Sequence, residues 1–198
     1  MAIRGGPVTA LPLQRPRLLT VAEFAALPED PEARYELQEG HVVMSPRPRP
    51  KHQLCLRALA SRLEEQLPAG VEVLPEVDID LELVSPPRPG FVRAPDLVVV
   101  SRETLVRVED GGLIRASEVA LVVEIISPGT HRTDTVIKHG EYADAGIPHY
   151  WIIDIEHGVS LTACHLAGEF GYLDAAARTG TATIDEPFSV RLDLDALL

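Results

Sequence analysis

Cysteines are scarce in this sequence, and their positions exclude a framework of disulfide bonds. Only two cysteines, Cys55 and Cys164, occur in 198 residues, and neither lies in a CxxC pair or a Cys/His spacing typical of structural zinc. We therefore expect two reduced, buried thiols. A chain of this length can bury about 70% of the surface that its unfolded form exposes, so the core needs no covalent reinforcement.

Long hydrophobic runs are also missing. The first nineteen residues hold three arginines but no continuous apolar segment, and nowhere do 18 apolar residues follow one another. A signal peptide and a membrane-spanning helix are therefore not expected. We predict a cytoplasmic protein without a membrane partner.

Basic residues are outnumbered by acidic ones, 18 to 30, which leaves a net charge of −12. Such a charge repels nucleic acid at long range and argues against a protein that coats DNA non-specifically. It is compatible with an enzyme that brings divalent cations to its substrate.

Helical and strand-like patterns alternate through most of the chain. Residues 1–17, with several glycines and prolines, are typical of a flexible lead-in, and residues 18–198 are expected to form a single domain. The patterns predict, in order, a helix over 20–27 capped by Thr20, a hairpin of 35–38 and 41–44, a helix over 51–67, strands over 71–83, 95–101 and 119–127, a helix over 133–145 capped by Thr133, and strands over 149–155, 159–166, 170–173 and 181–194. A long loop is expected to join the strand over 95–101 to the strand over 119–127. The expected fold class is α/β (α+β), a mixed sheet flanked by helices with extra hairpins at both ends.

One carboxylate stands inside an apolar strand. Glu124 lies in LVVEIISPG, residues 121–129, among side chains that are expected to be covered on both faces of a sheet. An unpaired carboxylate buried there would cost several kcal/mol, so a compensating partner is expected.

Antiparallel pairing with the preceding strand supplies a partner for Glu124. If the strand after Asp96 pairs with residues 119–126, Asp96 faces Glu124, and the pairs 98/122 and 100/120 follow on the same face. Two carboxylates about 5 Å apart must share a proton or hold a cation. A hard divalent ion such as Mg²⁺ or Mn²⁺ fits this requirement, and the carbonyl of Ile125 could be a further ligand.

Five segments resemble motifs of a nuclease family. They are YELQEGHVVMSP, PRPKHQLCLRALASRL, RAPDLVVVS, LVVEIISPGT and DTVIKHGEYADAGIPHYWIID. With the order of predicted elements, they resemble the PD-(D/E)XK nuclease superfamily of restriction-endonuclease-like fold, and more closely its Uma family of small bacterial endonucleases. The resemblance implies a metal-dependent endonuclease that hydrolyses DNA phosphodiester bonds, with Asp96 and Glu124 as metal ligands, and it allows a homodimer.

The lysine of the superfamily pattern is missing from its usual position, two residues after the second acid, where this chain has Ile126. Lys138 on the following helix is the expected substitute, as in the Uma pattern that the chain resembles. Its ammonium would stabilise charge on the scissile phosphate or orient the attacking water. The alternative is that Lys138 only pairs with Asp134, four residues earlier, which is worth about 0.3–0.5 kcal/mol on an exposed helix.

Three further residues have two interpretations each. Glu36 in YELQEG is a supplementary acid near the site, by the family resemblance, or an exposed strand carboxylate. His52 orients the substrate or Glu36, or faces solvent from the first turn of its helix. Arg93 contacts phosphate or lies in a surface loop.

Other polar and aromatic residues fit structural roles better. Asp78, Asp80 and Glu82 alternate with apolar residues, which indicates the solvated side of a strand rather than metal ligands. Trp151 is expected in the core, and Tyr150 in the core or at an interface.

Two other functions stay open. A catalytically inactive nuclease-fold module that binds nucleic acid or protein is favoured by Ile126 and the negative net charge, and is opposed by the retained Asp96, Glu124 and Lys138. A serine hydrolase built on Ser127, with His131 or His52 and with Asp96, has little support, because no GxSxG elbow surrounds Ser127.

Overall fold

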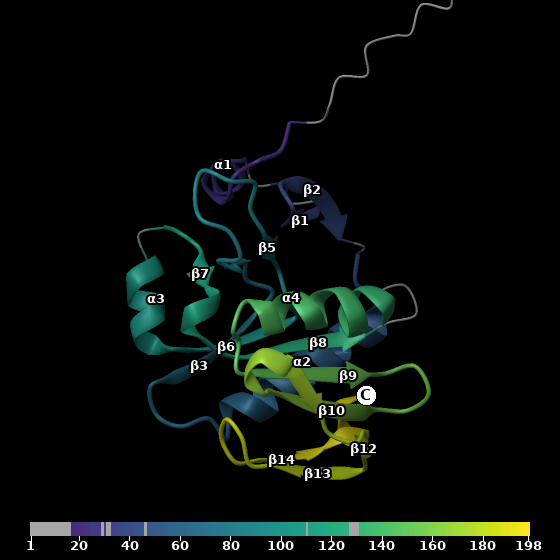
Figure 1. Cartoon of the computed structure of the whole chain (residues 1–198). Helices are drawn as coiled ribbons and strands as arrows, with labels where there is room; N and C mark the ends of the chain where they lie inside the picture. Colours follow the sequence, from purple (N-terminus) through teal and green to yellow (C-terminus); the bar gives the residue numbers. More distant parts are fainter. Residues whose placement is uncertain (1–16, 29, 31–32, 46, 110, 127–130) are drawn as a thin grey trace, which may run out of the picture.

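Three β-sheets with helices packed against them make up most of the described chain (Figure 1). The computed structural model describes residues 17–28, 30, 33–45, 47–109, 111–126 and 131–198. All but the last residue of the predicted lead-in lies outside the described residues, as does Ser127 of the hydrolase alternative. None of the described helices is both long and apolar enough to cross a membrane.

The described elements follow the predicted alternation of helices and strands, with several additions. In chain order they are α1 (Val21–Ala25), β1 (Arg34–Gln38), β2 (His41–Ser45), α2 (Pro50–Glu64), β3 (Val71–Pro75), β4 (Ile79–Asp80), β5 (Val92–Arg93), β6 (Leu97–Ser101), α3 (Arg102–Val108), β7 (Ile114–Arg115), η1 (Ala116–Glu118), β8 (Val119–Ile126), η2 (Thr133–Lys138), α4 (His139–Asp144), β9 (His149–Asp154), β10 (Ser160–Leu166), η3 (Gly168–Phe170), β11 (Tyr172–Asp174), β12 (Arg178–Thr179), β13 (Thr181–Ile184), β14 (Val190–Asp193) and η4 (Leu194–Leu197). Of these, η2 is a π-helical turn, and η1, η3 and η4 are short 3-10 helices.

A large mixed sheet forms the middle of the molecule. Its strand order is β11-β10-β9-β8-β6-β3, and β12 also pairs with β10. The strands β8 and β9 run parallel, whereas the other pairs in this sheet are antiparallel. The predicted mixed sheet flanked by helices is therefore confirmed.

The central strands are buried on both faces, because they consist of continuous apolar runs. On one face, α2 and the β13-β14 hairpin pack in a cluster with Leu121 and Trp151. On the other face, Tyr142 of α4 belongs to a second cluster around Val122. Every residue of β8 except Ala120 is buried, so any charge on this strand needs a partner inside the fold.

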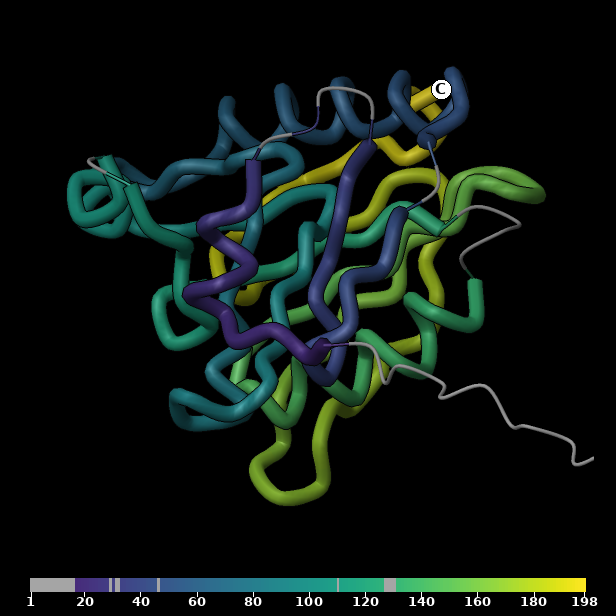
Figure 2. Tube along the Cα trace, turned by 90° about the horizontal axis from the view of Figure 1, so that it is seen from above, coloured from purple at the N-terminus to yellow at the C-terminus, as the bar shows by residue number. Residues whose placement is uncertain are grey.

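A second sheet of short strands carries the N-terminal hairpin and has the order β2-β1-β5-β4-β7. Seen from above, this hairpin lies over the strands of the large sheet (Figure 2). The predicted hairpin is confirmed, since Gln38 pairs with His41. Glu39 and Gly40 adopt φ angles of 50° and 78°, as a type I′ turn requires. This sheet brings polar side chains of β1 and β5 toward the end of the large sheet.

One predicted strand is wrong in its extent. The alternating run over residues 71–83 divides into β3 of the large sheet and β4 of the small sheet. The division has a backbone cause, because Glu76 and Glu82 adopt φ angles of 56° and 53°, which interrupt an extended path. Asp78 and Asp80 are consequently half-buried rather than part of one solvated face.

The connection between β6 and β8 holds more structure than the predicted loop. It contains α3, whose N-cap Ser101 accepts a hydrogen bond from the Thr104 N–H, and also β7 of the small sheet. The predicted pair 100/120 is wrong as well. A register shift within the pair places Val100 opposite Val119.

Two further predictions are corrected near the middle and the end of the chain. Residues 131–132 are already helical, so Thr133 lies inside the helix and does not cap it. The run over 181–194, predicted as strand, divides into β13 and β14, which pair with each other as a separate hairpin in the part of the chain that the structure describes. Their apolar residues Ala182 and Leu192 still pack in the cluster on one face of that sheet.

Candidate functional site

Asp96 and Glu124 come together at the end of the β6-β8 pair. Val98 lies opposite Val122, as predicted, and continuing this register places Asp96 across from Glu124. Both carboxylates are buried, with exposed fractions of 8% and 3%. Both also line a cleft of about 280 Å³ that is formed by residues from the two larger sheets, α2 and η2.

One oxygen of Asp96 is held by two groups. Its Oδ2 accepts a hydrogen bond from the Ile125 N–H at 2.7 Å and lies 3.1 Å from Nε2 of His52. Among the described residues, the groups that contact this carboxylate, the Ile125 N–H and His52, both meet Oδ2. The other oxygen, Oδ1, is left for a ligand in the cleft.

His52 is buried in the first turn of α2, so the interpretation that it faces solvent is wrong. Its recorded side-chain contact is with Asp96, and not with Glu36. Burial by itself lowers the pKa of His52, but the hydrogen bond and charge of Asp96 outweigh that effect and raise it. The imidazole is therefore placed to orient the Asp96 carboxylate.

Oε1 of Glu124 also accepts two hydrogen bonds. Nζ of Lys138 lies 2.9 Å away, and the hydroxyl of Tyr142 lies 2.7 Å away. Burial raises the pKa of Glu124, the Lys138 ammonium offsets part of this, and the charges of Asp96 and Asp134 raise it further, to about 8. The donors within the described residues leave Oε2 of Glu124 for a ligand, as at Asp96.

Lys138 is buried at the end of the π-helical turn, a feature that often occurs at functional sites. Its Nζ lies 2.9 Å from Glu124, 3.1 Å from Glu36 and 3.7 Å from Asp134. The interpretation that it pairs only with Asp134 is therefore wrong, since Asp134 is the most distant of the three. Burial by itself lowers the pKa of Lys138, but the three carboxylates outweigh it and raise the pKa, so the ammonium stays charged.

Arg93 joins Glu36 to Glu141 beside the cleft. Its Nη1 donates to Glu36 at 2.9 Å, and its Nε and Nη2 donate to the two oxygens of Glu141 at 2.6 and 2.7 Å. Arg93 is 1% exposed and Glu36 is 4% exposed, so the surface-loop arginine and the exposed carboxylate are both wrong. Burial by itself raises the pKa of Glu36, but Lys138, Arg93 and the Ala94 N–H outweigh it and lower the pKa. Glu36 is thus an ionised partner of two buried cations.

Three residues of η2 and α4 complete the site. The sequence suggested Asp134 only as a pairing partner of Lys138, and it did not indicate Glu141 or Tyr142. Asp134 lies near the Lys138 ammonium, Glu141 binds Arg93, and Tyr142 donates to Glu124. Each is three or four residues from Lys138, so all share one side of the helix. If the Lys138 side chain is taken to point into the fold, this spacing predicts that these three residues lie on the same side as Lys138.

Other candidate residues lie away from the cleft. Asp78, Asp80 and Glu82 are not among the described residues that line it. Trp151 and Tyr150 are fully buried, as expected of core residues. The Tyr150 hydroxyl donates to the backbone carbonyl of Asp134 at 2.9 Å.

The donor set of the cleft suits a hard cation. Oδ1 of Asp96 and Oε2 of Glu124 are carboxylate oxygens without a protein donor among the described residues, and Mg²⁺ and Mn²⁺ prefer oxygen ligands. Asp134 adds a further negative charge, whereas Lys138 compensates only part of the total. Ile125 also lines the cleft, and its carbonyl as a ligand stays a prediction.

Comparisons with known proteins identify a family and a shared fold. The model of the family Uma2, described as "Putative restriction endonuclease", matches residues 21–195. Among curated proteins, none matches the chain. A solved structure titled as a putative nuclease belonging to DUF820, from Anabaena variabilis ATCC 29413, is similar with a TM-score of 0.69 and 20% sequence identity, over 90% of this chain and 97% of that one. This likeness shows that the two chains share a fold.

Proposed function

The chain belongs to the Uma2 family, as its motifs predicted, and we propose that it is a metal-dependent endonuclease that hydrolyses DNA phosphodiester bonds. The family description supports a nuclease function in general terms. One observation carries the finer proposal: the Lys138 ammonium lies 2.9 Å from Glu124, which shares the cleft with Asp96. A carboxylate pair beside a buried cation is suited to binding a metal and a phosphate together.

Asp96 and Glu124 would hold the cation through their unengaged oxygens, with the Ile125 carbonyl as a third ligand. When bound, Mg²⁺ or Mn²⁺ would lower the pKa of an attacking water and offset charge on the scissile phosphate. The protein fixes its ligands in advance. The Ile125 N–H and His52 hold Asp96, while Lys138 and Tyr142 hold Glu124.

Lys138 would act as a cation and a hydrogen-bond donor. Because its pKa is raised, the ammonium keeps its proton at neutral pH and cannot accept one from water. It can donate a hydrogen bond to the attacking water or to a phosphate oxygen on which charge develops. Glu36, 3.1 Å from Nζ, would serve as the supplementary acid that holds the lysine in place.

The alternative of a catalytically inactive module depended on Ile126 and on the negative net charge. Ile126 is 3% exposed and belongs to an apolar cluster, so its side chain contributes to packing. Because the Lys138 ammonium lies beside Glu124, the absence of a lysine at position 126 no longer argues for an inactive protein.

Three broader expectations complete the proposal. Residues 18–198 would act as one domain, the protein would be cytoplasmic, and two copies could pair as a homodimer.

A cleavage assay with plasmid and single-stranded DNA in the presence of Mg²⁺ tests the function. We expect the wild-type protein to cleave and Asp96→Asn and Glu124→Gln to lose cleavage, because each substitution removes a carboxylate that would bind the metal. Asp80→Asn, which changes a strand carboxylate outside the cleft, is the matched control and should cleave normally. Undiminished cleavage by both cleft variants would overturn the proposed metal site.

A further inference from the structure

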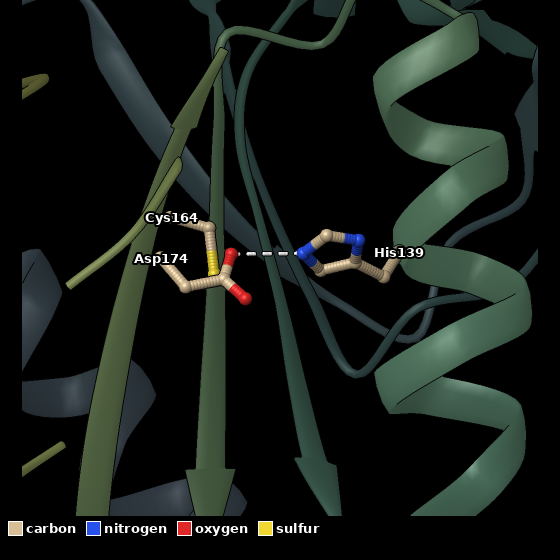
Figure 3. Close-up of side chains that lie close together, drawn as sticks. All are labelled: His139, Cys164 and Asp174. Atoms are coloured by element: carbon tan, nitrogen blue, oxygen red, sulfur yellow. Dashed lines mark hydrogen bonds and ion pairs between the residues drawn. The ribbon is translucent and has the colours of Figure 1, made fainter. Parts of the chain in front are cut away.

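A second cluster of metal-binding side chains lies outside the cleft, where α4 packs against the β10-β11 hairpin. It consists of His139, Cys164 and Asp174, each of which offers one ligand atom within 4.8 Å of the other two. His139 is the first residue of α4, whereas Cys164 and Asp174 are directly paired across β10 and β11. The three side chains point toward one another from the helix and the two strands (Figure 3).

The imidazole of His139 is already aimed at the two strands. Its Nε2 lies 2.9 Å from Oδ1 of Asp174. Its ring also meets Tyr172 and Tyr150 edge to face, at centroid distances of 5.2 and 6.0 Å. These aromatic contacts restrict the ring orientation, so little conformational freedom would be lost when the nitrogen binds a ligand.

We propose that His139, Cys164 and Asp174 bind a divalent ion of the zinc class. An imidazole nitrogen, a thiolate sulfur and a carboxylate oxygen are the ligand types that zinc takes, usually in tetrahedral geometry. Magnesium prefers oxygen ligands and does not favour sulfur, so the two candidate sites of this chain would select different metals. The Asp174 side chain is 51% exposed, which gives a water molecule access to the fourth position.

The distances require small adjustments. For metal–ligand bonds of about 2.0–2.3 Å, tetrahedral ligand atoms lie about 3.3–3.6 Å apart. The distance of 2.9 Å between the His139 nitrogen and the Asp174 oxygen would increase by a few tenths of an ångström. The Cys164 sulfur, which now lies within 4.8 Å of both atoms, would move closer to them. Both changes are within reach of side-chain torsions at unchanged backbone positions.

Metal binding must also remove the thiol proton of Cys164. Burial raises the pKa of this thiol, and Asp174 raises it further, so the group is protonated without a metal. As the sulfur–metal bond forms, the S–H bond breaks and the proton passes to solvent, with no change of oxidation state. One proton is therefore released for each ion bound at neutral pH.

The consequence for the fold is a link between α4 and the β10-β11 hairpin. Lys138 immediately precedes His139, so an ion held by His139 would restrain the backbone next to the cleft lysine. No short-range motif indicates this cluster, because its members come from three elements and meet only in the folded chain. Binding of an ion by these three residues does not depend on DNA cleavage.

Cobalt titration of tag-free, chelator-treated, full-length protein under reducing conditions tests the site. Co²⁺ bound to a thiolate gives a charge-transfer absorption band, which should saturate at one ion per chain and disappear when Zn²⁺ is added. His139→Gln, Cys164→Ser and Asp174→Asn should each lose the band. Cys55→Ser, which changes the other buried thiol, should keep it, and so should Asp96→Asn in the cleft.

The proposal would be overturned by the lack of a saturable band in the wild-type protein, by a band that survives Cys164→Ser, or by a band that Cys55→Ser removes. Because Cys164 is buried, the Cys164→Ser variant could fail to fold. The Asp174→Asn variant is then the test, because the Asp174 side chain is half-exposed. Loss of the band in Asp96→Asn would also overturn it, since the ion would then occupy the cleft.

Discussion

The ammonium of Lys138 lies 2.9 Å from a carboxylate oxygen of Glu124, although 14 residues separate the two along the chain. Glu124 belongs to β8 and Lys138 to the π-helical turn that follows it. The superfamily pattern places its lysine on the strand itself, where this chain has Ile126. A lysine on the next helix therefore reaches the same carboxylate from another direction, and Ile126 is free to pack in the apolar core.

Lys138→Met should greatly reduce DNA cleavage while Mg²⁺ binding persists. The substitution keeps the length of the apolar stem but removes a charge aimed at the reaction centre, and loss of one such donor costs about 10²–10³ in kcat. Single-turnover cleavage and a calorimetric Mg²⁺ titration measure the two effects separately.

Val136→Ala, at an exposed position of the same turn, is the control for Lys138→Met and should cleave normally. If Lys138→Met also cleaved at the wild-type rate, Lys138 would be only a structural partner of Glu124 and Glu36.

His52→Leu should weaken Mg²⁺ binding about 10–100-fold, because outer partners orient the groups that hold a metal. His52→Gln should restore part of the loss, since its amide nitrogen can take the place of Nε2 near Asp96. The matched control is Gln53→Ala, at an exposed position of the same helix. Equal Mg²⁺ affinity for the Leu variant and the wild-type protein would show that His52 does not orient Asp96.

Arg93→Met should lower the free energy of unfolding by about 3–5 kcal/mol, because Glu36 and Glu141 would lose a buried partner. Arg62→Met, which removes an exposed pair with Glu65, should cost less than about 1 kcal/mol. Urea unfolding of both variants measures the difference. Similar losses for the two arginines would contradict the buried network.

The stability that Glu36 contributes should depend on pH. Its pKa in the folded state lies below the ordinary value of 4.5, so its contribution is present above that value and is lost as the pH falls through the folded-state pKa. We expect Glu36→Gln to be less stable than the wild-type protein at neutral pH, and the gap to shrink in acid. Urea unfolding at a series of pH values checks this, and a gap of constant size would contradict it.

Strand parity made the Asp96–Glu124 pair predictable from the sequence. The alternation of side chains along two paired strands fixes which residues share a face, and two apolar runs identified the strands themselves. The register shift at Val100 escaped prediction, because it lies on the far side of the pair and leaves the 98/122 match intact.

The second sheet and the buried arginine could not be predicted in the same way. The strands β4, β5 and β7 have two residues each, too few to show a period. Arg93 binds Glu141, which lies 48 residues later in the chain, and no local sequence pattern predicts a contact at that separation. The helix around Lys138 could be predicted in part. The spacing of residues predicted the helix, but it did not predict that the Lys138 side chain points into the fold.

Calorimetric titration of the chelator-treated protein with Mg²⁺ measures directly whether Asp96 and Glu124 bind a divalent cation. Mg²⁺ is suited to the oxygen ligands of the cleft and unsuited to the thiol of Cys164, so it reports on Asp96 and Glu124 alone. We predict saturable binding to the wild-type protein, normal binding to Asp80→Asn, and loss of binding in Asp96→Asn and Glu124→Gln. Wild-type protein that binds no Mg²⁺, or Asp96→Asn that binds it unchanged, would contradict the account.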